Sequence, residues 1–94
     1  ALQRCQRGES AGEDPVLRAH TRFGPGFMLQ QAGSREAGFG PGLQSFGHAG
    51  SGGSFAFADP EQEMGFAFVM NQMGPYVLVD PRARRLIDAV YACL

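Results

Sequence analysis

Two short segments of the chain alternate large and small side chains, and this pattern constrains the fold more than any other feature. Residues 54–58 read SFAFA and residues 65–70 read GFAFVM, so phenylalanine recurs at every second position. A period of two is typical of β-strands that bury one face. An Asp-Pro turn separates the two segments, which predicts an antiparallel hairpin. The phenylalanines expected to share one face of it are Phe55, Phe57, Phe66 and Phe68.

Further strands are predicted at residues 26–31 and 45–49, where large apolar residues cluster beside glycine. Pro25 stands at the start of the first of these strands, as expected for a residue that cannot donate to a β-ladder. The glycines and proline of residues 31–42 predict a loop. Their run GFGPG, at residues 38–42, lacks the spacing and the following helix of a dinucleotide-binding fingerprint.

A helix is predicted over residues 81–94, because Asp80 and Pro81 form a typical helix start, with an N-cap carboxylate followed by proline. Arg82, Arg84 and Arg85 are interpreted as a solvated polar face with Asp88 as a local partner. The alternative is that they meet an acidic partner or a part of the fold that lies outside this chain. The apolar residues of the segment recur on one helical face, which is expected to pack on the sheet. They are Leu86, Ile87, Val90, Tyr91 and Leu94.

The first 22 residues are polar and of mixed charge, with turn signals at Gly8, Gly12 and Pro15. They predict a polar surface segment that has little order in isolation, and a short helix over residues 1–7 is compatible with the sequence. The sheet and helix are expected to occupy residues 23–94.

Composition excludes several classes of chemistry. A chain of 94 residues is enough for one small domain, and its formal net charge of -1 gives no expectation of a nucleic-acid partner. All 8 basic residues are arginine. Without lysine, these residues cannot supply a Schiff base, a Walker-type phosphate loop or a Ser-x-x-Lys nucleophile pair.

Four side chains could in principle bind a metal, but their scatter along the chain has no recognisable ligand spacing. They are Cys5, His20, His48 and Cys93. We therefore expect no metal, no cofactor and no disulfide framework. We also expect no membrane span, because no apolar run approaches roughly 20 residues, and no signal peptide at the start of the chain. No compartment is predicted.

Residues 47–54, GHAGSGGS, combine an extended pattern with glycines that let a ligand or a second backbone approach closely. The surroundings of Ser51 approximate the G-x-S-x-G nucleophile elbow, but that motif needs a helix after the serine, and here a strand follows. We therefore expect the backbone to act. An extended edge can bind a substrate while a backbone N–H faces a developing oxyanion.

This region resembles the C-terminal end of serine hydrolases of the β-lactamase superfamily, which includes class C β-lactamases, penicillin-binding proteins and related carboxylesterases. RFGPGFM, at residues 22–28, resembles the strand region that precedes the family motif. The resemblance covers about residues 14–94. The residues that carry it are FGHAGSGGS at 46–54, FADP at 57–60, GFAFVMN at 65–71 and DPRA at 80–83, followed by Leu86, Ile87 and Tyr91.

In this family a Lys-Thr-Gly signature lies on the strand that lines the catalytic cleft, and His48, Ala49 and Gly50 take its place here. The resemblance implies that His48 orients the substrate or shares in proton transfer, and that the backbone N–H of Ser51 supplies half of the oxyanion hole. It also implies that Ala49, Gly50 and Gly52 line the substrate site. Histidine here replaces the lysine of the family motif, and alanine replaces its threonine. These two differences argue against penicillin as the substrate and favour an ester or amide substrate.

The expected fold class is therefore α+β: an antiparallel sheet with a C-terminal helix packed on one face, as a fragment of the β-lactamase/transpeptidase-like fold. The implied function is that of the C-terminal part of an esterase or amidase that acts through an acyl-enzyme on a small-molecule or peptide substrate. Neither Ser-x-x-Lys nor Tyr-x-Asn occurs, so we expect both upstream and expect the chain to be inactive alone. The alternative is a non-catalytic, hydrolase-like binding or scaffold module.

Overall fold

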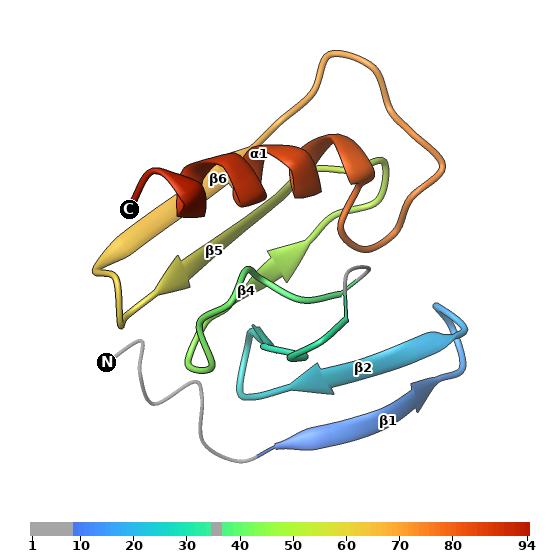
Figure 1. Cartoon of the computed structure of the whole chain (residues 1–94). Helices are drawn as coiled ribbons and strands as arrows, with labels where there is room; N and C mark the ends of the chain where they lie inside the picture. Colours follow the sequence, from blue (N-terminus) through green and yellow to red (C-terminus); the bar gives the residue numbers. More distant parts are fainter. Residues whose placement is uncertain (1–8, 35–36) are drawn as a thin grey trace.

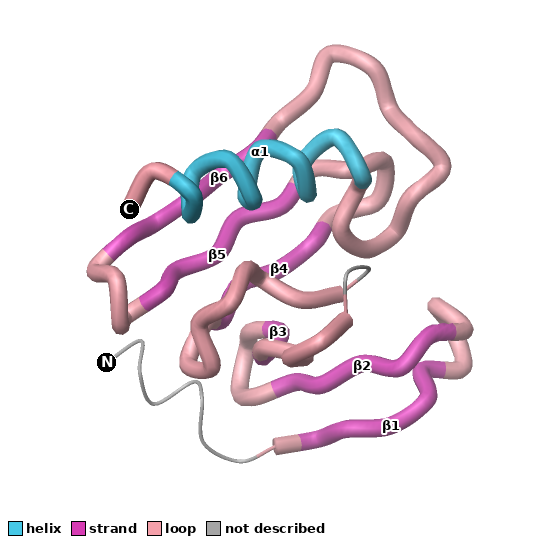
Figure 2. Tube along the Cα trace, viewed as in Figure 1, coloured by secondary structure: helices cyan, strands magenta, loops and turns pink. Residues whose placement is uncertain are grey.

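The computed structural model describes residues 9–34 and 37–94 and shows one antiparallel sheet with a helix across one face (Figures 1 and 2). The six strands lie in the sheet in chain order, and every neighbouring pair is antiparallel. This arrangement confirms the α+β class. The elements are β1 (Ser10–Asp14), β2 (Ala19–Phe23), β3 (Met28–Leu29), β4 (Phe46–Ala49), β5 (Phe55–Asp59), β6 (Met64–Phe68) and α1 (Pro81–Ala92).

The predicted phenylalanine hairpin is confirmed as β5 and β6. Phe55 pairs with Phe68 and Phe57 pairs with Phe66, so the four rings fall on one face of the sheet. The Phe57 and Phe66 ring centroids are 5.6 Å apart, and those of Phe55 and Phe57 are 5.9 Å apart. Aromatic contacts at these separations add to the stabilisation that burial provides.

Two strands that the sequence did not predict lie in residues 10–23, which include most of the described part of the polar N-terminal segment. β1 and β2 form a hairpin in which Asp14 caps the turn, since its Oδ1 accepts hydrogen bonds from the backbone N–H groups of Val16 and Leu17. β1 is the edge strand, with three of its five residues exposed, and β2 lies between β1 and β3 with mostly half-buried residues. Neither strand shows an apolar alternation that the sequence could reveal. The helix considered for residues 1–7 lies outside the described residues.

The loop between β3 and β4 covers part of the same face as α1. Its Phe39 is buried and stacks on Phe55 and Phe57, with ring centroids 6.4 Å and 5.7 Å apart. A buried glutamine fixes the loop: Gln30 accepts from the backbone N–H of Phe39 at 2.6 Å and donates to the carbonyl of Gly42 at 2.6 Å. The core joins this loop, the sheet and the helix. Its members are Met28, Phe39, Ala49, Phe55, Phe57, Val79, Ala83 and Ile87.

The helix begins as predicted. Asp80 is its N-cap, accepting from the backbone N–H of Arg82 at 2.8 Å, and Pro81 opens the first turn. The predicted buried face is correct only at Ile87, with Val90 and Tyr91 half-buried. The other two predicted members, Leu86 and Leu94, are exposed.

The buried face of α1 is rotated toward Ala83 and Arg84, and the prediction that Arg84 is solvated is wrong. The Arg84 guanidinium donates to the carbonyl of Gly38, in the loop that also carries Phe39. Sequence pattern alone counts arginine as polar surface. It cannot register that a folded loop places a carbonyl acceptor beside this side chain.

The far end of the helix is joined to the hairpin by a hydrogen bond between Tyr91 and Asp59. The phenol donates to Oδ2 of Asp59 at 2.5 Å, while Oδ1 of this 1% exposed carboxylate accepts from the backbone N–H of Glu61. Burial and the hydrogen bond to Asp59 raise the pKa of Tyr91. The phenol therefore keeps its proton where the helix needs a donor.

Replacing Tyr91 by phenylalanine is expected to lower the free energy of unfolding by about 1.5–3 kcal/mol, the usual value of a hydrogen bond to a charged acceptor. Because the phenol pKa is higher in the folded than in the unfolded protein, Tyr91 contributes its full stability below the ordinary pKa of about 10. This contribution is lost as the pH rises through the pKa of the folded protein. Urea denaturation from neutral to alkaline pH measures both effects. Tyr76→Phe, which removes an exposed phenol, is the control, and equal losses in the two variants would contradict the prediction.

Candidate active-site strand and turn

The predicted site residues, 48–52, are consecutive. His48 and Ala49 end β4, and the other three lie in the turn that follows it. On one side β4 pairs along its whole length with β5. On the other side β3 pairs only with Phe46 and Gly47. Within the described ranges, the end of β4 that holds His48 and Ala49 therefore has a strand partner on one side only. An extended ligand could pair with the second edge.

His48 is exposed, whereas its neighbours Gly47 and Ala49 are buried. Its Nδ1 lies 2.7 Å from the carbonyl oxygen of Ala49, and its ring centroid lies 5.9 Å from that of Phe23. A carbonyl oxygen only accepts, so this contact assigns the proton to Nδ1. In the neutral ring Nε2 is then the acceptor, and it belongs to a side chain that solvent and a ligand can reach.

A tight turn follows β4 and places Ser51 at its tip. The backbone N–H of Gly50 donates to the carbonyl of Ser54 at 2.6 Å, and that of Gly53 donates to the carbonyl of Gly50 at 3.3 Å. Gly52 has φ +97° and Gly53 has φ +120°, values that favour glycine. Ser51 is exposed, and in the part of the chain that the structure describes its backbone N–H has no hydrogen-bond partner.

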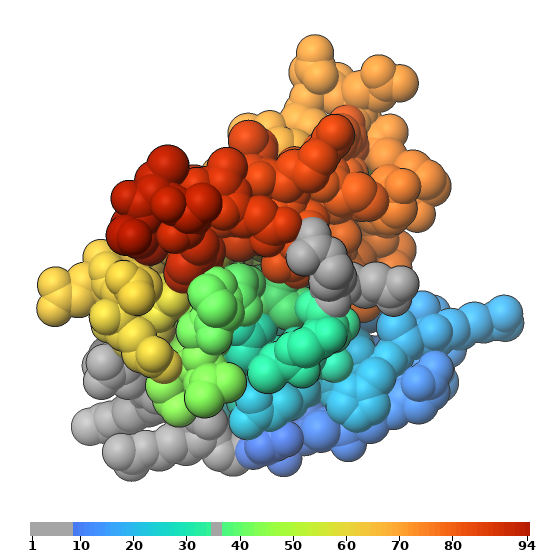
Figure 3. Space-filling model, viewed as in Figure 1, coloured from blue at the N-terminus to red at the C-terminus, as the bar shows by residue number. Residues whose placement is uncertain are grey.

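The loop that leads to α1 supports this turn. The backbone N–H of Gly52 donates to the carbonyl of Tyr76 at 2.8 Å, and the carbonyl of Gly52 accepts from Gly74 at 2.8 Å. Residues 70–77 project from the rest of the surface, as the orange segment of Figure 3 shows. The position of the Ser51 turn therefore depends on a segment more than twenty residues further along the chain.

Asp80 lies behind the turn and was predicted only as a helix cap. Its side chain is buried, and a Cβ added to Gly53 would lie 2.5 Å from its Oδ2. Arg82 pairs with it: Nη2 donates to Oδ2 at 2.7 Å, while Nη1 donates to the carbonyl of Gln72 at 3.2 Å. The hydrogen bonds from Arg82 lower the pKa of Asp80. Asp80 and Arg82 are only two residues apart, so a contact between them is visible in the sequence. The sequence does not show that this pair lies behind the Ser51 turn.

The remaining predicted residues take different positions. Ala49 packs its methyl group in the core, so any contact of Ala49 with a substrate would be made by its main chain. Gly50 is held against Ser54, whose Oγ would lie 2.7 Å from an added Cβ. A Cβ added to Gly52 would lie 2.8 Å from Cε of Met73. Only His48 and Ser51 present groups outward from this stretch.

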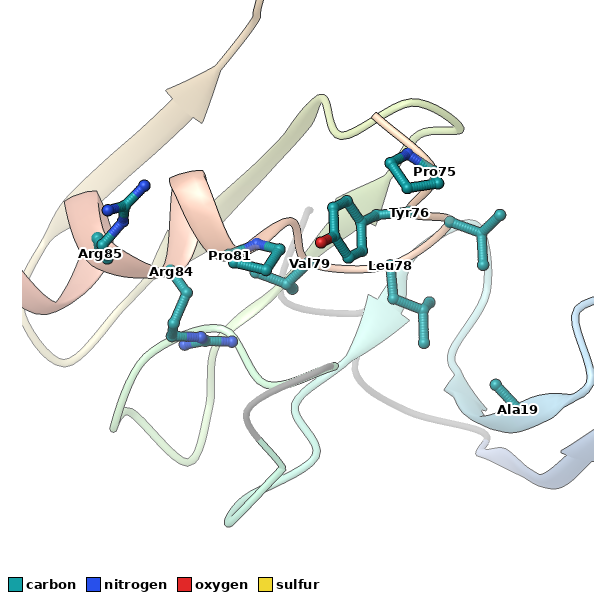
Figure 4. Close-up of a pocket in the computed structure, with 9 residues that line it drawn as sticks. Ala19, Pro75, Tyr76, Leu78, Val79, Pro81, Arg84 and Arg85 are labelled. Atoms are coloured by element: carbon teal, nitrogen blue, oxygen red, sulfur yellow. The ribbon is translucent and has the colours of Figure 1, made fainter. Parts of the chain in front are cut away.

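A hollow of about 680 Å³ lies beside the start of α1, and none of residues 48–52 lines it (Figure 4). Its wall is mostly apolar and comes from the loop before the helix, with Ala19 on β2 and the stems of Arg84 and Arg85 on the helix. Tyr76 belongs to both the Ser51 turn and the hollow. Its carbonyl accepts from the backbone N–H of Gly52 in the turn, and Tyr76 is also one of the residues that line the hollow.

No three histidine, cysteine, aspartate or glutamate side chains in the described ranges come together as a metal site. Cys93 is a free, exposed thiol at the end of α1. Among the helical segments that the structure describes, none is long and apolar enough to cross a bilayer.

The fold places the chain in a class, that of proteins with a β-lactamase-type sheet and helix, and two solved structures share this fold. The structure is similar to the crystal structure of a family VIII carboxylesterase, with 39% sequence identity and a TM-score of 0.88. It is also similar to that of a novel penicillin-binding protein homolog from Caulobacter crescentus, with 40% identity and a TM-score of 0.87. Both matches cover 99% of this chain and 24% of the other.

A family model described as beta-lactamase matches residues 1–91. The chain therefore belongs to the beta-lactamase family, as the resemblance at residues 46–71 implied. The chain spans 24% of the length of each of the two structures that it matches. A search of curated proteins found no match.

Proposed function

We propose that this chain supplies the cleft-lining strand and one oxyanion-hole donor of a serine hydrolase that cleaves an ester or amide through an acyl-enzyme. The observation that carries the proposal is the backbone N–H of Ser51, which lies at an exposed turn without a partner in the described ranges. An N–H held rigidly in this way stabilises negative charge as it develops on a carbonyl oxygen. The nucleophile, a serine followed by lysine three residues later, would come from another part of the protein.

The chemistry divides between the turn and β4. When the external serine attacks the substrate carbonyl, the carbonyl oxygen becomes an oxyanion, and the Ser51 N–H donates to it. The unpaired edge of β4 binds the extended part of the substrate through its main chain. His48, with its proton assigned to Nδ1, offers Nε2 to the substrate or to a proton in transfer. The 94 residues contain no Ser-x-x-Lys motif, so we expect no turnover from them alone.

Ser51→Pro tests the oxyanion donor, because it deletes the N–H while suiting the turn. Ser51 is the second residue of a turn whose third residue, Gly52, has a positive φ, and proline is common at that second position. We expect kcat for a nitrophenyl ester to fall about 10²–10³-fold in the full-length protein. Ser51→Ala keeps the N–H and should retain activity within about threefold. Loss of activity in Ser51→Ala but not in Ser51→Pro would overturn the assignment.

A fluorophosphonate probe separates the enzyme from a non-catalytic module of the same fold. The hydrolase predicts covalent labelling of the full-length protein and an activity that falls at least about tenfold in His48→Ala. The chain of 94 residues should remain unlabelled. A full-length protein that binds a peptide or lipid, takes no label and is indifferent to His48→Ala would be the binding module instead.

A further inference from the structure

The loop that holds the Ser51 turn also presents an apolar side chain beside that turn. Gly52, the residue after Ser51, exchanges backbone hydrogen bonds with Gly74 and Tyr76 of this loop. Met73 directly precedes Gly74. A Cβ added to Gly52 would lie 2.8 Å from Cε of Met73, so the Met73 side chain fills the space beside Gly52. The Met73 thioether therefore lies beside the residue that follows the Ser51 N–H donor.

The side chains of Met73 and Tyr76 are not buried in the core. Met73 is 70% exposed and Tyr76 is 41% exposed, although the loop between them is fixed by two backbone hydrogen bonds. Exposed methionine on a held backbone is typical of a surface that adapts to apolar ligands. The hollow beside Tyr76 continues this apolar lining with Pro75, Val77 and Leu78 (Figure 4).

The charge at this position argues against an anionic substrate. Arg82 is the arginine that reaches the loop, and its Nε and Nη2 donate to Asp80 while Nη1 donates to the carbonyl of Gln72. Asp80 thus accepts from two of the three Arg82 nitrogens and balances the charge of the guanidinium. A substrate carboxylate beside Met73 would meet an apolar thioether and an arginine whose charge Asp80 already balances.

We propose that Met73 and Tyr76 form the wall against which the apolar, non-reacting group of a neutral ester packs while its carbonyl oxygen lies at the Ser51 N–H. This inference rests on the proposed function and adds the substrate class: uncharged esters with a long aliphatic or aromatic substituent. Whether that substituent belongs to the acyl or to the alcohol side is an outcome of the test.

The test compares two ester series on the full-length protein. One series keeps the nitrophenol and changes the acyl chain from acetyl to octanoyl; the other keeps the acetyl group and changes the alcohol from ethanol to octanol. Met73→Gln preserves side-chain length and removes the apolar surface. It is expected to lower kcat/KM about tenfold for the long ester of one series, while the acetyl ester of nitrophenol stays within about twofold. The series that responds identifies the side of the substrate that contacts the loop.

Met73→Leu, which stays apolar, should keep the wild-type preference, and Leu43→Gln, at an exposed apolar residue of another loop, should leave it unchanged. A Met73→Gln protein with the wild-type ratio in both series would overturn the wall while leaving the oxyanion assignment in place. Absence of hydrolysis of every ester by the unaltered protein, together with no fluorophosphonate label, would overturn the proposed function and the wall with it.

Discussion

Gly47→Ala is expected to lower the free energy of unfolding by about 3 kcal/mol or more, because β4 and β5 leave no room for one methyl group at this position. An added Cβ would lie 2.1 Å from the carbonyl oxygen of Ala56 and 2.6 Å from Cα of Phe57. Both atoms belong to the backbone of β5, so no side-chain rotation relieves the clash. The strands would have to separate where β4 leads into the site.

Gly65→Ala is the matched control for this substitution. Gly65 lies in β6 of the same sheet, its φ is not in the positive range, and an added Cβ would find no other atom within 4 Å. Its stability should stay within about 0.5 kcal/mol of the unaltered protein. Urea denaturation followed by circular dichroism measures both variants. If Gly47→Ala were as stable as Gly65→Ala, the close approach of β4 to β5 would be wrong.

The parts of the fold that could be predicted are those in which burial repeats along the chain. The phenylalanines of β5 and β6 alternate because one face of the hairpin is in the core, and Asp80 with Pro81 marks a helix start through local chemistry. β1 left no such signal because most of its residues face solvent on both sides of an edge strand. Arg84 was misplaced for a related reason: its acceptor, Gly38, is distant in sequence.

The same distinction applies to the candidate site. Residues 48–52 were predicted together because they are consecutive, and both glycine composition and family resemblance point to them. Their support was not predictable, since it consists of single hydrogen bonds between Gly52 and a loop that has no periodic pattern. Met73 and Tyr76 read in sequence as ordinary apolar residues of a connection. Only the pairing of that connection with the Ser51 turn gives them a possible role.

Asp80→Ala is expected to lower the free energy of unfolding by about 3 kcal/mol. The substitution deletes the helix N-cap, worth about 1 kcal/mol, and leaves Arg82 without its carboxylate. Breaking a fully buried pair costs about 3–5 kcal/mol, but the Arg82 side chain is 38% exposed, and water replaces part of what it loses. Asp80→Asn retains a capping oxygen and should lose about half as much, which separates the cap from the charge.

The pH dependence gives the sharper test, because it isolates the charge. Hydrogen bonds from Arg82 lower the pKa of Asp80, so this carboxylate contributes its full stability above its ordinary value of about 3.9 and loses it as the pH falls through the folded value. The stability gap between the unaltered protein and Asp80→Asn should therefore be constant near neutrality and shrink on acidification. Urea midpoints between about pH 7 and pH 3 measure it. Glu13→Gln, at an exposed carboxylate of β1, should show no comparable gap.

Asp80→Asn should also act on the site, since Oδ2 of Asp80 lies against Gly53 of the Ser51 turn and Arg82 holds the carbonyl of Gln72. A loosened turn costs transition-state stabilisation more than substrate binding, so kcat should fall while KM changes little. Loss through unfolding would instead reduce the amount of active protein, which titration with a fluorophosphonate counts directly. An Asp80→Asn protein with an unchanged kcat per labelled site would show that the pair stabilises the helix start but does not position the Ser51 N–H.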